Sequence, residues 1–274
     1  VSASLITAPL VPLYRYLIDY PDDAPERLDD LLQIYGPQDK IVREIQLFSA
    51  SLLCALSAML MFGALKESVN LTWALLGTVV YAFGTTVFST ASRAMWQHSP
   101  SVLFLALLLL ALTRLQKGKR WHFIAGFAIA VAYTVRPTNS ISVLIVTLYI
   151  LFQHRHAAFY YFTGAACIAI PFLTFNYINF DTFLPPYFAA SRLGSPFFLE
   201  ALAGNLISPS RGIFLFSPFL LFMFWRSDTS REQNSLLRLL YAIMGLHLIV
   251  ISLFPHWWGG HSNGPRFFTD LMPF

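Results

Sequence analysis

Long runs of apolar residues, separated by short polar segments, dominate the chain. Ile45–Leu65 holds 21 residues without a charge, and Leu71–Ser92 holds 22. At a rise of 1.5 Å per residue, helices of that length can cross the hydrocarbon layer of a bilayer. The pattern predicts eight spans, at Ile45–Leu65, Leu71–Ser92, Ser99–Thr113, Trp121–Val135, Thr138–Gln153, Ala157–Phe180, Ile207–Trp225 and Leu236–Phe254. The predicted fold is an all-α, polytopic transmembrane helical bundle.

Composition agrees with a membrane protein. Apolar residues make up 56% of the chain and charged residues 12%, with a mean hydropathy of +0.59. Soluble domains carry about 25% charged residues. The net charge of +4 comes from loops without a basic, aromatic-interleaved patch, so it does not indicate nucleic-acid binding. Cys54 and Cys167 both lie in apolar runs and are interpreted as packing residues.

The two ends of the chain differ from its middle. Val1–Ile18 is apolar but contains two Pro and an Arg, which favours an interfacial helix over a span. Asp19–Glu44 carries eight carboxylates and is predicted to be a solvated loop with a short helix. We therefore expect residues 1–44 to be the end of an external loop. Residues 45–254 would form the eight-span domain, and residues 255–274 an external Trp-Gly-rich loop with the start of a further span.

Orientation follows from Arg114–Arg120, which packs four cations into seven residues. Short cationic loops stay on the cytoplasmic side. Successive spans cross the membrane in alternating directions, so this loop fixes the side of every other turn. Four polar turns at span ends, called the outer corners below, are then placed outside: Ser89–Pro100, Tyr133–Asn139, Ser208–Gly212 and Pro255–Phe268. Over the whole chain the Lys and Arg count is nine inside and nine outside. Without residues 1–44 it is nine inside and five outside, which favours this orientation.

Each outer corner places one Arg at or just inside the end of a span. An Arg at that depth is costly unless it snorkels to the surface, pairs, or faces a polar cavity. Its planar fork can hold phosphate oxygens in two places. Four such Arg indicate a shared anion site for a lipid phosphate or diphosphate, with snorkelling as the alternative. The predicted substrate-binding residues are Arg93, His98, Arg136, Asn139, Arg211, Trp258, His261 and Arg266.

Acid–base and metal chemistry have weaker signals. His98, His256 and His261 lack the spacing of helical metal ligands, so no metal site is predicted. Asp270 is a candidate for catalytic chemistry, because it is a carboxylate at a span entrance near Arg266. It could equally be the ion-pair partner of that Arg.

The polar corners, taken together, resemble a known class. The combination comprises Ser92-Arg93-Ala94-Met95-Trp96-Gln97-His98, Arg136-Pro137-Thr138-Asn139, Ser208-Pro209-Ser210-Arg211-Gly212 and Trp257-Trp258-Gly259-Gly260-His261-Ser262-Asn263-Gly264-Pro265-Arg266. In this order it is similar to the dolichyl-phosphate-mannose–protein mannosyltransferases and the lipid A aminoarabinose transferases, which are GT-C class glycosyltransferases. The resemblance runs through nearly the whole chain.

This resemblance implies a multi-pass protein of the cell membrane that uses a polyprenyl-phosphate sugar donor on the extracytoplasmic face. The acceptor could be a glycan, a lipid or a protein. In that class the catalytic carboxylate lies in the first external loop, which we expect to precede Val1, so the chain is expected to lack the first span and that loop. Asp19, Asp22 and Asp23 are interpreted as loop residues, and no catalytic base is assigned. No cofactor is evident from the sequence, which neither requires nor excludes a divalent cation.

Two other functions share part of this pattern. A transporter or flippase for a lipid-linked or anionic solute would also need cations at the membrane surface. Such proteins usually carry charges or broken helices near the bilayer midplane, and often an internal repeat. The predicted spans contain almost no ionisable residue at their centres. A non-catalytic relative that binds a polyprenyl lipid is the third hypothesis.

Overall fold

The computed structural model describes residues 40–184, 194, 197–224, 230–260 and 264–274, and these residues form helices and turns without any strand. The predicted interfacial helix and most of the predicted acidic loop fall in residues 1–39, outside the described part. The longer helices are α4 (Lys40–Leu65), α5 (Leu71–Phe83), α6 (His98–Thr113), α7 (Lys119–Val135), α8 (Ser140–Gln153), α9 (Ala158–Phe180), α10 (Phe198–Ile207) and α12 (Arg231–Ser252). The short ones are α11 (Ile213–Phe216), η1 (Val87–Ala91), η2 (Leu115–Lys117), η3 (Pro137–Asn139), η4 (Arg155–Ala157), η7 (Pro218–Phe224) and η8 (Arg266–Leu271).

The predicted fold class is confirmed. Among the described residues, three helical segments are long and apolar enough to cross a membrane, at Arg43–Leu65, Arg155–Phe180 and Gln233–Ser252. Shorter apolar helices lie beside them. Large apolar side chains are exposed on the outside of the bundle, such as Phe159 and Ile178 of α9. An outer surface of this kind is stable against lipid and not against water.

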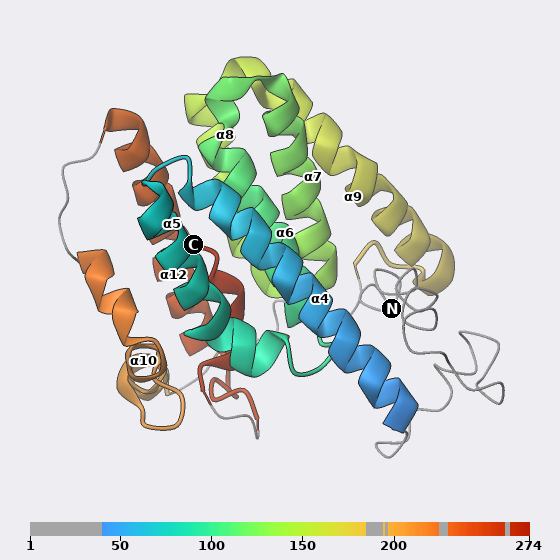
Figure 1. Cartoon of the computed structure of the whole chain (residues 1–274). Helices are drawn as coiled ribbons and strands as arrows, with labels where there is room; N and C mark the ends of the chain where they lie inside the picture. The colour runs from blue at the N-terminus through green and yellow to red at the C-terminus, as the bar shows by residue number, and fades with distance from the viewer. Residues whose placement is uncertain (1–39, 185–193, 195–196, 225–229, 261–263) are drawn as a thin grey trace.

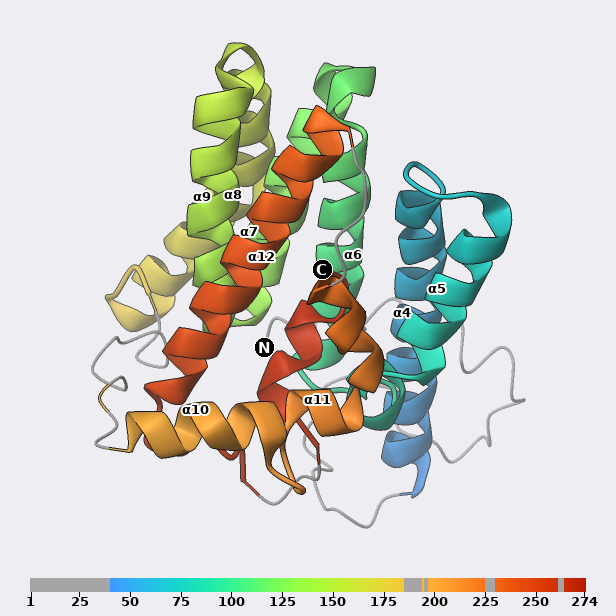
Figure 2. The same cartoon turned by 90° about the vertical axis from the view of Figure 1, so that its left-hand side faces the viewer.

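Helix α6 forms the centre of the bundle. Most of its apolar residues are buried, including Val102, Leu105 and Leu108, each fully covered. A helix that is apolar all round is stable only when neighbours enclose it. Helices α4 and α7 pack against α6, α9 packs against α7, and α12 packs against α8 and α10. Figures 1 and 2 show these long helices side by side, with the C-terminal residues inside the bundle.

Two predicted spans are interrupted in the structure. Within Leu71–Ser92, α5 ends at Phe83, where the N–H of Gly84 caps the helix, and a π-helical turn follows. Within Ile207–Trp225, α10 ends at Ile207, and only the single turn α11 and the 3-10 segment η7 follow. Pro209 and Pro218 have no N–H to donate to a helix, and Gly212 adds conformational freedom, which explains the break. Figure 2 shows α10 and α11 lying across one end of the bundle.

Helices α7 and α9 approach each other closely through two glycines. A Cβ atom on Gly126 would lie 1.9 Å from the carbonyl oxygen of Tyr161, and one on Gly164 would lie 2.0 Å from that of Phe123. Neither distance is possible for a side chain. Small residues at such crossings let two membrane helices gain van der Waals contact along their backbones.

At the end of the bundle opposite α10, Glu67 forms salt bridges with Arg114 and Lys117. The Nε of Arg114 donates to Glu67 Oε1 at 2.7 Å, and Lys117 Nζ donates to Oε2 at 2.5 Å. The guanidinium of Arg114 also lies 4.9 Å from the ring centre of Trp121. This carboxylate ties the turn between α4 and α5 to the end of α6.

Replacing Gly164 by Ala is expected to destabilise the bundle by about 1–3 kcal/mol, because the added methyl group overpacks the α7–α9 crossing. Gly245→Ala on α12 is the matched control, since a Cβ there meets no atom within 4 Å. Thermal unfolding in detergent measures both. An equal melting temperature for the two variants would show that the crossing is looser than this geometry requires.

The Glu67 corner predicts a pH dependence of stability. The hydrogen bond from Lys117 has the largest effect and lowers the pKa of Glu67. Burial, the second-largest effect, opposes it, and the hydrogen bond and charge of Arg114 lower the pKa further. Because the folded-state pKa is below that of a free glutamate, about 4.3, the stabilisation is present above that pH and is lost as pH falls through the folded-state pKa. We expect the difference in melting temperature between wild type and Glu67→Gln to shrink on acidification, with a size under about 1 kcal/mol. Glu200→Gln, at an exposed position, is the control. A difference that stays constant down to pH values near 3 would contradict the role of this carboxylate.

Candidate functional site

The four predicted outer corners meet at one end of the bundle. Arg136 Nη1 contacts both ring nitrogens of His98 and lies 2.8 Å from Nε2, which joins the end of α7 to the start of α6. Arg266 Nε donates to the same Nε2 at 3.4 Å. The N–H of Gly264 donates to the carbonyl of Ser210 at 2.9 Å, and so connects the loop before η8 to the turn after α10. Sequence segments more than 100 residues apart therefore form one polar cluster.

Arg136 owes its position to the proline that follows it. A residue before Pro is kept out of the α region, and Arg136 has φ −142° and ψ 123°, which ends α7 at Val135. The chain then turns through η3 into α8. This break points the Arg136 side chain into the bundle, where only 5% of the residue is exposed.

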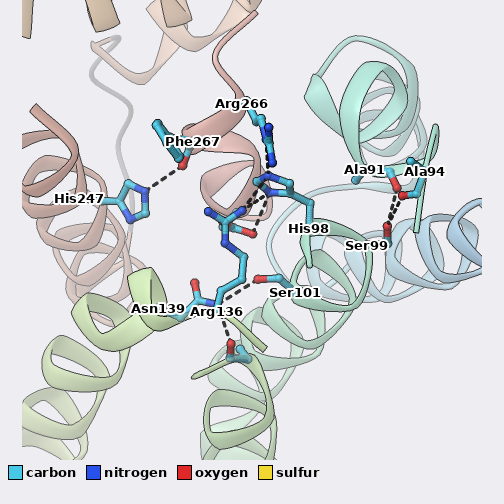
Figure 3. A network of polar contacts seen from close by, with 12 residues as sticks. Ala91, Ala94, His98, Ser99, Ser101, Arg136, Asn139, His247, Arg266 and Phe267 are labelled. Atoms are coloured by element: carbon cyan, nitrogen blue, oxygen red, sulfur yellow. Dashed lines mark hydrogen bonds and ion pairs between the residues drawn. The ribbon is translucent and has the colours of Figure 1, made fainter. Parts of the chain in front are cut away.

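His98 joins the two arginines (Figure 3). It is the first residue of α6 and is 2% exposed. A neutral imidazole accepts a hydrogen bond at one nitrogen and donates at the other. Nε2 accepts from Arg266 and lies near Arg136, and Nδ1 also contacts Arg136 and lies 3.6 Å from Asp270 Oδ1.

Asp270 completes the cluster from η8. Its Oδ2 lies 3.0 Å from Arg136 Nη1, and the residue is 1% exposed. Neither carboxylate oxygen has a hydrogen-bond partner among the described residues, so both keep unused acceptor capacity. The sequence suggested Arg266 as a partner for this carboxylate, but the structure pairs it with Arg136.

Asn139 holds the helices that carry the cluster together. Its Nδ2 donates to Ser101 Oγ at 2.9 Å and to the carbonyl of Ala132 at 2.8 Å. Both bonds are buried, so this amide fixes the α7–α8 turn against α6. On the far side, His247 Nε2 donates to the carbonyl of Phe267 at 3.0 Å and holds η8 against α12 (Figure 3).

The cluster reaches the surface at Arg266, whose guanidinium lies over the Trp96 ring, 3.8 Å from its centre. A small crevice beside it is lined by Arg211, Arg266, Trp257 and Trp258, among others. Arg211 Nη2 donates to the carbonyl of Gly260 at 2.5 Å. Arg211 and Arg266 therefore both border one small opening of about 10 Å³, and Arg136 is buried behind Arg266, on the other side of His98.

The tryptophans of this loop have different surroundings. The Trp257 ring occupies the place of a side chain at Gly204, where a Cβ would lie 2.1 Å from the ring. It thus anchors the loop on α10. Trp258 is 42% exposed and meets the Trp257 and His256 rings edge-on, with centres 6.2 and 5.1 Å away.

Two predicted site residues are not placed in the cluster. Arg93 is exposed, with its guanidinium 5.5 Å from the ring centre of Phe88, and no contact joins it to His98 in the described part of the chain. His261 falls outside the described residues. The described residues contain no group of three His, Cys, Asp or Glu side chains that could hold a metal ion.

Sequence reasoning missed three contributors. Ser101 and His247 lie inside apolar helices and look like ordinary packing residues, although a His within an apolar run is a signal that we did not use. Trp96 was noted for its sequence motif, but not as a platform for Arg266.

Two cavities flank the bundle. An apolar groove of about 450 Å³ lies beside the cluster between α10, α11, η7, α12 and η8, and its lining includes Ile213, Met244, Leu248 and Phe268. A polar cavity of about 580 Å³ lies at the other end, beside Glu67, His154 and Arg238. The polar cavity is larger, but it shares no residue with the arginine cluster.

The apolar outer surface and the three helices long enough to cross a bilayer define an integral membrane protein. The sequence profile of the dolichyl-phosphate-mannose-protein mannosyltransferase family matches residues 41–178, and the chain belongs to this family. Membership implies a membrane setting and a lipid-linked sugar donor. Searches of curated proteins and of solved structures found no match.

Removing Arg136 should destabilise the protein, because it leaves the buried Asp270 carboxylate without a counter-charge. We expect Arg136→Ala to cost about 3–5 kcal/mol of unfolding free energy. Arg93→Ala, at an exposed position, should cost under about 1 kcal/mol. Melting temperatures in detergent compare the two, and similar losses would show that the pair is not a structural centre.

Proposed function

We propose that this protein transfers a sugar from a polyprenyl-phosphate donor to an acceptor on the extracytoplasmic face of the cell membrane. The observation that carries the proposal is the meeting of Arg211 and Arg266 at one opening, with Arg136 behind them. Guanidinium groups hold phosphate oxygens through paired, charge-assisted hydrogen bonds.

The neighbouring groove supports a lipid ligand. Phe268 and Leu271 of η8 line the apolar groove, while Arg266 and Asp270 of the same short helix belong to the polar cluster. A phosphate at Arg266 would therefore place an attached isoprenoid chain at the mouth of the groove. Its volume, about 450 Å³, falls in the usual range for ligand pockets, about 300–1,000 Å³.

The arginines would also assist the reaction itself. When the bond between the sugar and the phosphate oxygen breaks, negative charge develops on the leaving phosphate. Preorganised cations in a site with little water stabilise that charge more in the transition state than in the ground state. Because Asp270 lies against Arg136, we assign it to charge balance and not to removal of the acceptor proton.

Donor binding tests the proposal directly. The full-length protein, purified in mild detergent and supplied with polyprenyl phosphate, is examined by native mass spectrometry. We expect a lipid adduct on wild type and an affinity about ten- to a hundredfold lower for Arg266→Gln, since a charged hydrogen bond contributes about 1.5–3 kcal/mol. Arg155→Gln, an exposed Arg at the other end of the bundle, should bind like wild type. Equal binding by all three proteins would overturn the phosphate site.

The groove has its own test. Gly245 lines it and has open space beside its Cα, so Gly245→Leu should fill part of the volume. We expect this variant to bind a long-chain polyprenyl phosphate more weakly than wild type, with little change for a short-chain analogue. Ala242→Leu places the same side chain on an exposed position of α12 that is not among the groove residues. If long-chain binding were equal in the two variants, the lipid chain would lie elsewhere.

A transfer assay separates the enzyme from a transporter. With radiolabelled donor in vesicles, the enzyme yields labelled acceptor. Movement of donor across the bilayer without any transfer product would favour the transporter hypothesis instead.

A further inference from the structure

We propose that Asp270 sets the charge of the phosphate site, so that the site favours a singly charged phosphodiester over a doubly charged phosphomonoester. This inference rests on the proposed function, because it assumes that a lipid phosphate binds beside Arg266. It adds a specificity-determining residue and the ionic class of the preferred ligand.

The geometry gives Arg136 a counter-ion of its own. Asp270 Oδ2 lies 3.0 Å from Arg136 Nη1, and neither residue is more than 5% exposed. His98 lies against both arginines and links this pair to Arg266. The carboxylate therefore cancels one positive charge immediately behind the arginine that borders the crevice. Without it, Arg136 would add its full charge to the field at the opening.

The charge of the ligand changes in the proposed reaction. The donor is a phosphodiester with one negative charge. The sugar–oxygen bond breaks with its electron pair going to the phosphate, the acceptor oxygen forms the new bond to the sugar, and the acceptor proton goes to a base. The lipid product is a phosphomonoester, which carries close to two negative charges above its second pKa of about 6.

One added charge in the protein matters more for the product than for the donor. Two unit charges about 10 Å apart, at an effective dielectric constant of about 20, interact strongly enough to change an affinity roughly tenfold. The single negative charge of the diester interacts with the added protein charge once, whereas the two negative charges of the monoester interact with it twice. Asp270 thus weakens binding of the product relative to the donor by about tenfold, which favours release of the spent lipid after transfer.

A matched pair of unreactive probes tests this prediction. Farnesyl phosphate and its methyl diester share one lipid chain and differ by one charge at about pH 8. Their dissociation constants are measured on the full-length protein in detergent, for wild type and Asp270→Asn. We expect the substitution to shift the ratio of the two constants toward the monoester by about tenfold. A purely structural role of Asp270 would weaken both probes equally, and an unchanged ratio would overturn the proposal.

Two further variants complete the charge series. Arg136→Gln removes a positive charge and should shift the ratio the other way, toward the diester; because it leaves Asp270 unpaired, as Arg136→Ala does, its constants are measured on the folded fraction recovered in detergent. Arg136→Gln combined with Asp270→Asn restores the net charge of wild type and should restore its ratio. A double variant that keeps the shift of the single one would mean that local geometry, and not charge, controls selectivity.

The outcomes also separate this inference from the proposed function. If wild type binds neither probe, the phosphate site itself is wrong and the inference falls with it. If wild type binds both probes, Arg266→Gln weakens both, and Asp270→Asn leaves the ratio unchanged, then the phosphate site stands and only the role of Asp270 is wrong.

Discussion

The buried contact between Arg136 and Asp270 determines how this end of the bundle is assembled. Two opposite charges enclosed among membrane helices are stable only while they remain together, since either one alone would carry a large desolvation cost. Their partnership fixes η8 to the end of α7, and His98 extends the contact to the first turn of α6. Arg266 reaches the same imidazole, so the placement of the surface arginine follows from the placement of the buried pair.

The apolar pattern made the helical bundle predictable, because each long uncharged run needs lipid or other helices around it. It also made the polar corners predictable as a group, since alternating spans return them to one side. Turn chemistry was harder to interpret. In Ile207–Trp225 the composition favoured a span, but Pro209, Gly212 and Pro218 divide it, and the backbone follows those residues and not the average hydropathy.

Pairing within the cluster was not accessible from the sequence. Asp270 is four residues from Arg266, but its partner is Arg136, which is 134 residues away. Such a choice depends on how α6, α7 and η8 pack, and no local pattern encodes it. The same reason explains Ser101 and His247, whose hydrogen bonds to Asn139 and to η8 exist only after the helices meet.

Helix α6 has a further consequence through its length. Its 16 residues span about 24 Å, whereas the hydrocarbon layer of a typical bilayer is about 30 Å thick. Because longer helices enclose α6, the outer surface of the bundle can still match the bilayer while an end of α6 lies within the hydrocarbon depth. His98 begins this helix, so the arginine cluster would lie deeper than the lipid headgroups. A lipid phosphate would then have to leave the headgroup layer to reach it.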